Sequence, residues 1–279
     1  MDTDGVIEPH ARNSLIFFLA LTFALSSIFY VRSFSGAPLG QVVPLLMWMP
    51  GVAAIVTRLL FYRTIKGLGW HPGPWRYLAM AIAIPILYCL VIYVPVWLAG
   101  VGLFDGSYLR RVLPFLPIAM VQNLATALGE EIGWRGFLTP TLYRWRGFLW
   151  AGIGTGLIWA LWHVPLIVVG GYDAGTPAWY AITCFSISVP AMSVMLAWLR
   201  LRSTSLWTAV LFHAVHNLAI QGIFDGSTIN TGATRWITTE FGFGLAVVSV
   251  LIAIYFWSRR DELTAEARMS AVRSADQAT

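Results

Sequence analysis

Two adjacent glutamates, Glu130 and Glu131, interrupt a segment that is otherwise almost entirely apolar. Ionisable side chains inside a lipid-spanning segment are costly, so they usually mark a functional site. Arg135 follows Glu131 by four residues and would share its helix face, where the two charges can pair. One of two neighbouring carboxylates can serve as a general base for a water molecule. The alternative, from these residues alone, is a buried ion-pair network that holds helices together.

Polar side chains of two further apolar segments could complete such a site. His163 stands four residues after Trp159, and His213 stands four residues before Asn217. His213 and Asn217 would share a helix face, and two donors on one face suit the stabilisation of an oxyanion. The structural alternative for each of these residues is a hydrogen bond to a neighbouring helix. His216 lies off this face and is predicted to support the site from behind or to contact lipid headgroups.

The same residues leave metal chemistry open. Two histidines and one glutamate, with an open position for water, form the ligand set of many catalytic zinc sites. Here that set would be Glu130, His163 and His213, from three different helices. The pairing of His213 with Asn217 favours a metal-free site. The prediction is therefore that no cofactor is needed, with zinc as the alternative.

The composition places these residues in a membrane. Of 279 residues, 58% are hydrophobic and 11% are charged, and the mean hydropathy is +0.70. These values are far from those of a soluble domain and predict an all-α, polytopic membrane helix bundle. The formal net charge of +5 does not indicate a nucleic-acid partner, because the basic residues mostly flank apolar segments, as in membrane proteins.

Eight apolar segments are candidate membrane spans. They are Ser14–Val31, Val42–Phe61, Tyr77–Ala99, Val112–Leu138, Phe148–Val169, Trp179–Leu199, Leu206–Phe224 and Phe241–Trp257. Most arginines fall on one side of this topology, which predicts that both termini are cytoplasmic. We expect one membrane domain over residues 1–279, catalytic helices at 112–224 and a polar cytoplasmic tail at 259–279. Helix rise brings the glutamates and histidines of three helices to a similar depth.

The polar motifs resemble those of the CPBP family, the intramembrane CAAX-protease and bacteriocin-processing group, which is also called Abi. The family motifs Glu-Glu-x-x-x-Arg, Phe-x-x-x-His and His-x-x-x-Asn are matched, in order, by Glu130, Glu131 and Arg135, by His163, and by His213 and Asn217. Trp159 stands where the family usually has Phe, which is a conservative departure. The resemblance covers about Pro114 to Asn217. Each motif alone is common, whereas the ordered set on separate apolar segments is specific.

The resemblance implies a glutamate-type intramembrane endopeptidase related to the prenyl-protein CAAX endopeptidase. Glu130, helped by His163, would activate a water for attack on a peptide carbonyl, and His213 with Asn217 would stabilise the oxyanion. The second glutamate and the arginine of the first motif would order the site. The mechanism of the relatives also favours a metal-free reaction. The expected partners are membrane lipid and a CAAX-type, prenylated, leader or bacteriocin-type peptide.

Two other classes of protein remain open. A non-catalytic immunity factor or scaffold could use the same fold, with the glutamates as a structural network. A proton- or ion-coupled transporter could use glutamate and histidine as a relay, although the sequence has no inverted repeat that would support one. In each case the expected location is a bacterial plasma membrane, crossed several times.

Overall fold

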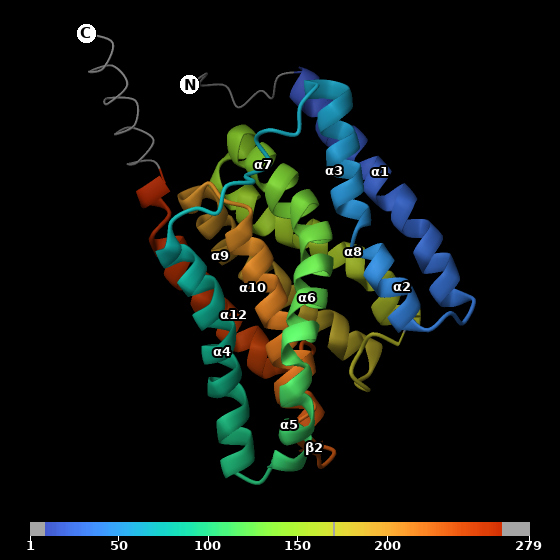
Figure 1. Ribbon diagram of the computed structural model, residues 1–279, viewed down its shortest axis with the longest axis vertical. Coiled ribbons are helices and arrows are strands. Elements are labelled where there is room, and N and C mark those ends of the chain that lie inside the picture. Colours follow the sequence, from blue (N-terminus) through green and yellow to red (C-terminus); the bar gives the residue numbers. More distant parts are fainter. Residues whose placement is uncertain (1–8, 170, 264–279) are drawn as a thin grey trace.

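The computed structural model describes residues 9–169 and 171–263, which form one helical bundle (Figure 1). The predicted all-α class is confirmed. Most of the predicted polar tail, from residue 264 on, lies outside the described residues. The N-terminal part consists of α1 (Pro9–Phe34), α2 (Leu39–Leu46), α3 (Met49–Thr57), the π-helical turn η1 (Arg58–Tyr62), α4 (Trp75–Leu98) and β1 (Gly102–Phe104).

The part that carries the three motifs begins with one long helical segment. This segment contains α5 (Gly106–Val112), η2 (Leu113–Phe115), α6 (Leu116–Glu131), the π-helical η3 (Ile132–Leu138) and α7 (Thr139–Arg146). The remaining elements are η4 (Trp150–Gly154), α8 (Thr155–Val169), α9 (Ala178–Ser203), α10 (Trp207–Asn217), η5 (Leu218–Phe224), β2 (Thr228–Asn230), α11 (Thr234–Ile237) and α12 (Phe243–Ser258). Strand β2 pairs antiparallel with β1, with Gly102 opposite Asn230.

Six helical segments of the described chain are long and apolar enough to cross a membrane. They are His10–Phe34, Leu39–Tyr62, Trp75–Leu98, Gly106–Arg146, Trp150–Val169 and Ala178–Ser203. The other two predicted spans are also helical. However, α10 with η5 carries several polar side chains, and α12 has only 16 residues. The chain is thus an integral membrane protein with several spans, and the last two spans remain predictions.

The helix ends that carry most of the arginines lie at one end of the bundle. Figure 1 places α7, η1 and the described start of α1 at this end, with α5 and β2 at the opposite end. The last turn of α7 contains Arg144 and Arg146, and the last turn of α9 contains Arg200 and Arg202. This distribution is the one that the positive-inside rule requires, so the arginine-rich end is the predicted cytoplasmic end.

The centre of the bundle is α9, in which every residue from Ser188 to Arg200 is buried. A helix that is apolar on all sides belongs in the interior. Helices α8, α10 and α12 pack against it.

Small residues bring α3 very close to the segment with the two glutamates. A Cβ atom on Gly51 would lie 2.4 Å from the carbonyl oxygen of Gly129. A Cβ atom on Gly133 would lie 2.5 Å from the Cβ of Pro50. Gly129 and Gly133 are four residues apart, as in the small-residue contacts by which membrane helices approach each other. Because Glu130 and Glu131 lie between these glycines, the α3 contact fixes the depth and direction of both carboxylates.

Asp225 at the end of η5 links the last part of the chain to α4. It accepts a hydrogen bond from the Tyr93 hydroxyl, which in turn accepts one from the Thr239 backbone N–H at 3.0 Å. Burial raises the pKa of Asp225 to about 7, even though the Tyr93 hydrogen bond lowers it. The folded protein therefore binds this proton more tightly than the unfolded chain does.

We expect the melting temperature in detergent to fall as the pH rises from about 4 to about 7, because the stabilising proton on Asp225 is lost over this interval. Asp225→Asn should flatten this part of the curve, since its side chain does not titrate. Circular dichroism melts at a series of pH values would measure both curves. Equal slopes for the two proteins would show that Asp225 does not set the pH dependence.

Candidate active site

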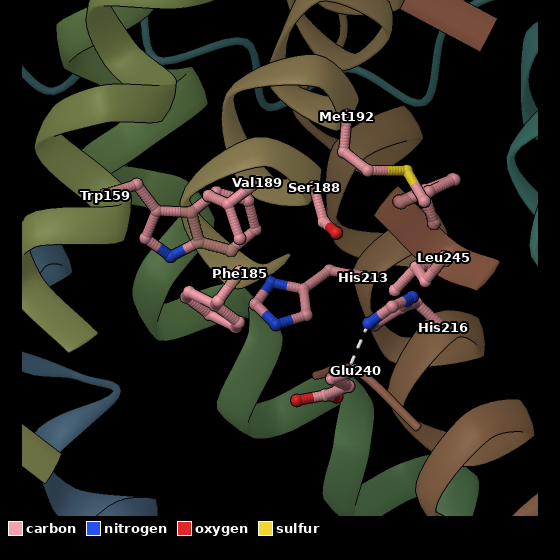
Figure 2. Close-up of a pocket in the computed structure, with 10 residues that line it drawn as sticks. Trp159, Phe185, Ser188, Val189, Met192, His213, His216, Glu240 and Leu245 are labelled. Atoms are coloured by element: carbon pink, nitrogen blue, oxygen red, sulfur yellow. Dashed lines mark ion pairs between the residues drawn. The ribbon is translucent and has the colours of Figure 1, made fainter. Parts of the chain in front are cut away.

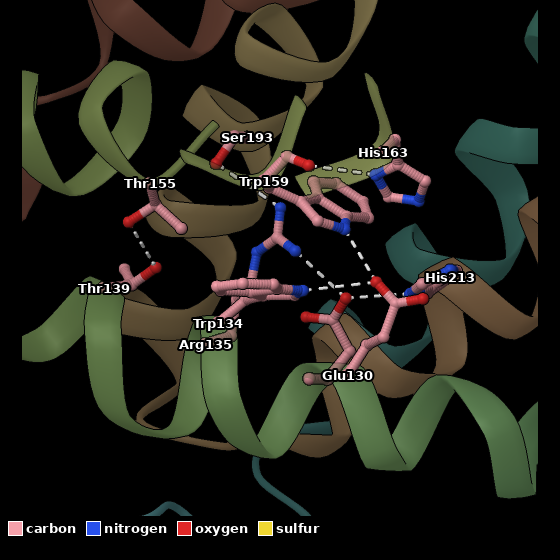
Figure 3. Close-up of polar contacts among 10 residues, drawn as sticks. Glu130, Trp134, Arg135, Thr139, Thr155, Trp159, His163, Ser193 and His213 are labelled. Atoms are coloured by element: carbon pink, nitrogen blue, oxygen red, sulfur yellow. Dashed lines mark hydrogen bonds and ion pairs between the residues drawn. The ribbon is translucent and has the colours of Figure 1, made fainter. Parts of the chain in front are cut away.

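Glu130 is held by two indole rings at the end of α6 (Figure 3). Its Oε2 atom accepts hydrogen bonds from Trp134 Nε1 at 3.2 Å and from Trp159 Nε1 at 2.7 Å. The side chain is 1% exposed. Among the described residues, none donates a hydrogen bond to its other oxygen, Oε1. The two indoles thus fix the carboxylate and leave one oxygen free for a reacting group.

Glu131 connects two of the other motif residues. Its Oε1 atom accepts hydrogen bonds from Arg135 Nη1 at 3.0 Å and from His213 Nδ1 at 2.9 Å. Glu131 and Arg135 are fully buried, and His213 is 6% exposed. Because the carboxylate accepts from Nδ1, the tautomer of His213 is set and its Nε2 is the ring nitrogen left for a ligand. Glu131 therefore orients His213, as an ordering role requires.

Arg135 is enclosed on all sides. Its guanidinium lies over the Trp159 ring, 4.1 Å from the centroid, and its Nη2 atom donates to Ser193 Oγ at 3.4 Å. The pair of Arg135 with Glu131 is fully buried. An uncompensated charge in an apolar interior is very costly, so each of the two charges depends on the other.

His163 is held in one tautomer by its own helix. Its Nδ1 atom lies 2.9 Å from the backbone carbonyl oxygen of Trp159. A carbonyl oxygen can only accept, so Nδ1 carries the proton and the neutral ring has an acceptor at Nε2. The ring also packs edge-on against Trp162 and stacks with Tyr172. His163 can therefore accept a proton or a hydrogen bond from a water in the site.

Four of the predicted residues line one cavity of about 210 Å³, which is large enough for several waters or a short peptide segment. They are Glu130, His163, His213 and Asn217. Its other polar lining comes from Asn123, Thr126, Tyr172 and Gln221, and its apolar lining from Val43, Pro44, Leu46, Met47, Trp162 and Leu166. Glu131 and Arg135 are not part of this lining. The structure thus separates the residues that can touch a substrate from the two that hold them.

His216 is held by two neighbouring side chains. It is half-buried, its Nδ1 atom is hydrogen-bonded to the Tyr88 hydroxyl, and its Nε2 atom lies 3.4 Å from Glu240. Figure 2 shows this pair beside His213, where both histidines line a second cavity of about 40 Å³. The contacts of its ring nitrogens are thus with side chains of the bundle, and its predicted role in supporting the site remains a prediction.

Several residues that shape the site were not predicted from the sequence. Trp134 follows Glu130 by four residues, so helical spacing could have indicated its contact with that glutamate. Trp159 stands in place of the usual Phe of the family motif, and its indole N–H is the feature that reaches Glu130. Gln221 continues the face of Asn217 by one turn. Glu240 lies in a loop far along the chain, and no local pattern points to it.

The alternative zinc ligands line one cavity but do not form a ligand cluster. Within residues 9–169 and 171–263, no group of three His, Cys, Asp or Glu side chains is close enough together to hold a metal ion. The arrangement does not fit a zinc site with these three ligands. The absence of a cofactor remains a prediction.

The chain is similar to known proteins over the part that forms this site. Residues 112–219 match the family model for the type II CAAX prenyl endopeptidases described as Rce1-like. A segment of 109 residues is 33% identical to CAAX prenyl protease 2 of Methanococcus maripaludis. That alignment covers 37% of this chain and 40% of the relative, so the match spans less than half of the relative's length. The matched residues include all three motifs.

Proposed function

We propose that this chain, whose residues 112–219 match the model of the Rce1-like CAAX prenyl endopeptidases, is an intramembrane endopeptidase. The observation that carries the proposal is that Glu130, His163, His213 and Asn217 together line one cavity of about 210 Å³. A carboxylate with one free oxygen, a histidine with a free acceptor nitrogen and two further polar groups are the parts that amide hydrolysis needs.

The chemical step begins with a water between Glu130 and His163. We propose that Oε1 of Glu130 removes a proton from this water as its oxygen attacks the carbonyl carbon, while His163 Nε2 accepts the other hydrogen as a hydrogen bond and orients the water. The tetrahedral intermediate then collapses, and its C–N bond breaks. The proton held by Glu130 passes to the leaving amine. One water is consumed, and one carboxyl and one amino terminus form.

The negative charge on the carbonyl oxygen is stabilised from α10. The Asn217 side-chain amide donates one hydrogen bond to it, and His213 as an imidazolium donates another from Nε2. Glu131 and Arg135 act through His213, because their buried hydrogen bonds hold its ring in place. Donors that are fixed before the reaction need no reorganisation in the transition state, which is the largest source of rate in many enzymes.

The proposed substrate is a prenylated CAAX-type peptide. The support comes from the name of the relative, a CAAX prenyl protease, and from the apolar cavity wall of Val43, Leu46, Met47 and Leu166. CAAX sequences carry the prenyl group on their cysteine. This apolar wall is suited to the aliphatic residues or to part of the prenyl chain.

The test is a cleavage assay with purified protein in proteoliposomes. The probe is the S-farnesylated peptide Gly-Ser-Ser-Cys-Val-Ile-Ala, and mass spectrometry of the products identifies the bond that breaks. We expect loss of the last three residues as one tripeptide. An intact peptide, after incubation with protein that melts cooperatively, would contradict the proposed function.

A metal-free reaction predicts that chelators leave activity unchanged. After treatment with 1,10-phenanthroline and gel filtration, we expect the cleavage rate to stay within about twofold, because no step uses a Lewis acid. Metal analysis of the same sample should find zinc well below one atom per chain. Loss of activity that returns with one equivalent of zinc would reverse the assignment and make Glu130 and the histidines candidate ligands.

A further inference from the structure

A buried carboxylate outside the matched segment organises one wall of the cavity. Glu240 lies between α11 and α12 and is 5% exposed. Its Oε1 atom accepts a hydrogen bond from Gln221 Nε2 at 2.5 Å, and its Oε2 atom accepts one from the Tyr172 hydroxyl. His216 is its third partner. Two of these three partners, Gln221 and Tyr172, line the cavity that contains Glu130.

The charge of Glu240 determines which way the Gln221 amide points. Burial alone would raise the pKa of Glu240, but hydrogen bonds from His216, Tyr172 and Gln221 lower it to about 2. An ionised carboxylate can only accept, so the Gln221 NH₂ group must face it. The second N–H of Gln221 donates to the Tyr172 hydroxyl at 3.4 Å. With both N–H groups used, Gln221 can offer a ligand only its amide oxygen.

The position of Gln221 suits an extended peptide. It follows Asn217 by four residues on the continuous helix of α10 and η5, and both side chains line the same cavity. Side chains about one helical turn apart lie roughly 5–6 Å from each other at Cβ. In an extended chain, backbone groups on the same side recur every two residues, at about 6.6 Å. When the scissile carbonyl oxygen of the peptide binds at Asn217, a backbone N–H two residues away along the peptide would therefore lie close to Gln221.

We propose that Gln221, oriented by Glu240, is a substrate-binding residue whose amide oxygen accepts a hydrogen bond from a backbone N–H of the extended peptide, two residues from the scissile carbonyl. This inference rests on the proposed function. It assigns Glu240 the role of a positioning residue, which acts only through Gln221 and Tyr172. The ligand class is the peptide backbone, so the contact would set the register of a substrate rather than its side-chain sequence.

Ester analogues of the farnesylated peptide test the contact without altering the protein. In each analogue one backbone N–H is replaced by oxygen, either two residues before the farnesylated cysteine or two residues after it. We expect one of the two esters to raise KM for the wild type about fivefold with kcat little changed, since a single hydrogen bond is lost. Gln221→Leu should raise KM for the all-amide peptide by a similar factor. For this variant, KM for that ester should then equal KM for the all-amide peptide.

Two variants complete the design. Glu240→Gln keeps the side-chain volume but can donate to the Gln221 oxygen, so the amide can turn and KM should rise in the same direction. Gln122→Leu is the matched control, because Gln122 is exposed on α6 and does not line the cavity. If neither ester changes KM of the wild type, or if Gln221→Leu remains sensitive to the ester, the contact is wrong while the protease stands. If the wild type cleaves no peptide, the proposed function fails and this inference fails with it.

Discussion

Glu130→Gln is expected to lower kcat for the farnesylated peptide by about 10³-fold, within the range that a general base supplies. The amide has the same size and can still accept hydrogen bonds from Trp134 and Trp159 through its oxygen. It cannot take a proton from water, so binding should be kept while the chemical step is lost. The measurement is the kcat and KM of both proteins in the same proteoliposomes, with anisotropy of a labelled peptide to compare binding.

The same variant separates a protease from the non-catalytic alternatives. Mapping of protein termini in membranes that contain wild type or Glu130→Gln, at matched expression, should find new termini only with the wild type. Equal sets of termini, with a folded variant and native host proteins, would favour an immunity factor or scaffold. Asn123→Ala is a useful companion, because Asn123 lines the same cavity but has no assigned chemical role, and its effect on kcat should be small.

The fold was largely predictable because a membrane imposes few choices on a chain. Backbone polar groups must be satisfied within each span, so an apolar segment of sufficient length predicts a helix. All eight predicted segments are helical in the structure, and the long fourth segment extends from Gly106 to Arg146. The limit of this reasoning appears at α10, where the polar residues of the site make a helix too polar to count as a span by composition alone.

The site was predictable as a set of residue types but not as a geometry. Spacing along one helix predicted the pair of Glu131 and Arg135, and the structure has that pair. Spacing could not predict that His213 also donates to Glu131, because this contact joins residues 82 positions apart. It also could not indicate Glu240, whose importance comes from a loop that folds back onto α10. Contacts between distant segments depend on packing, which single-sequence patterns do not record.

Glu131 and Arg135 do not line the cavity but hold residues that do, so changing them should affect the stability of the protein. Arg135→Met should lower the free energy of unfolding by about 3–5 kcal/mol, because it leaves the buried Glu131 carboxylate without its guanidinium. Methionine keeps much of the apolar contact with Trp159, so the loss reports the charge rather than the volume. Denaturant unfolding in detergent micelles, followed by tryptophan fluorescence, would measure the change.

The double variant Glu131→Gln with Arg135→Met gives the sharper result. It removes both charges of the pair, so we expect it to cost less than the sum of the two single variants and less than Arg135→Met alone. Arg111→Met is the matched control, since Arg111 is 65% exposed and pairs with Asp105 at 3.8 Å, and it should leave unfolding unchanged. Additive losses would show that the two charges do not depend on each other. Coupled losses would mean that catalysis and stability share one constraint: the network that holds His213 also keeps the surrounding helices together.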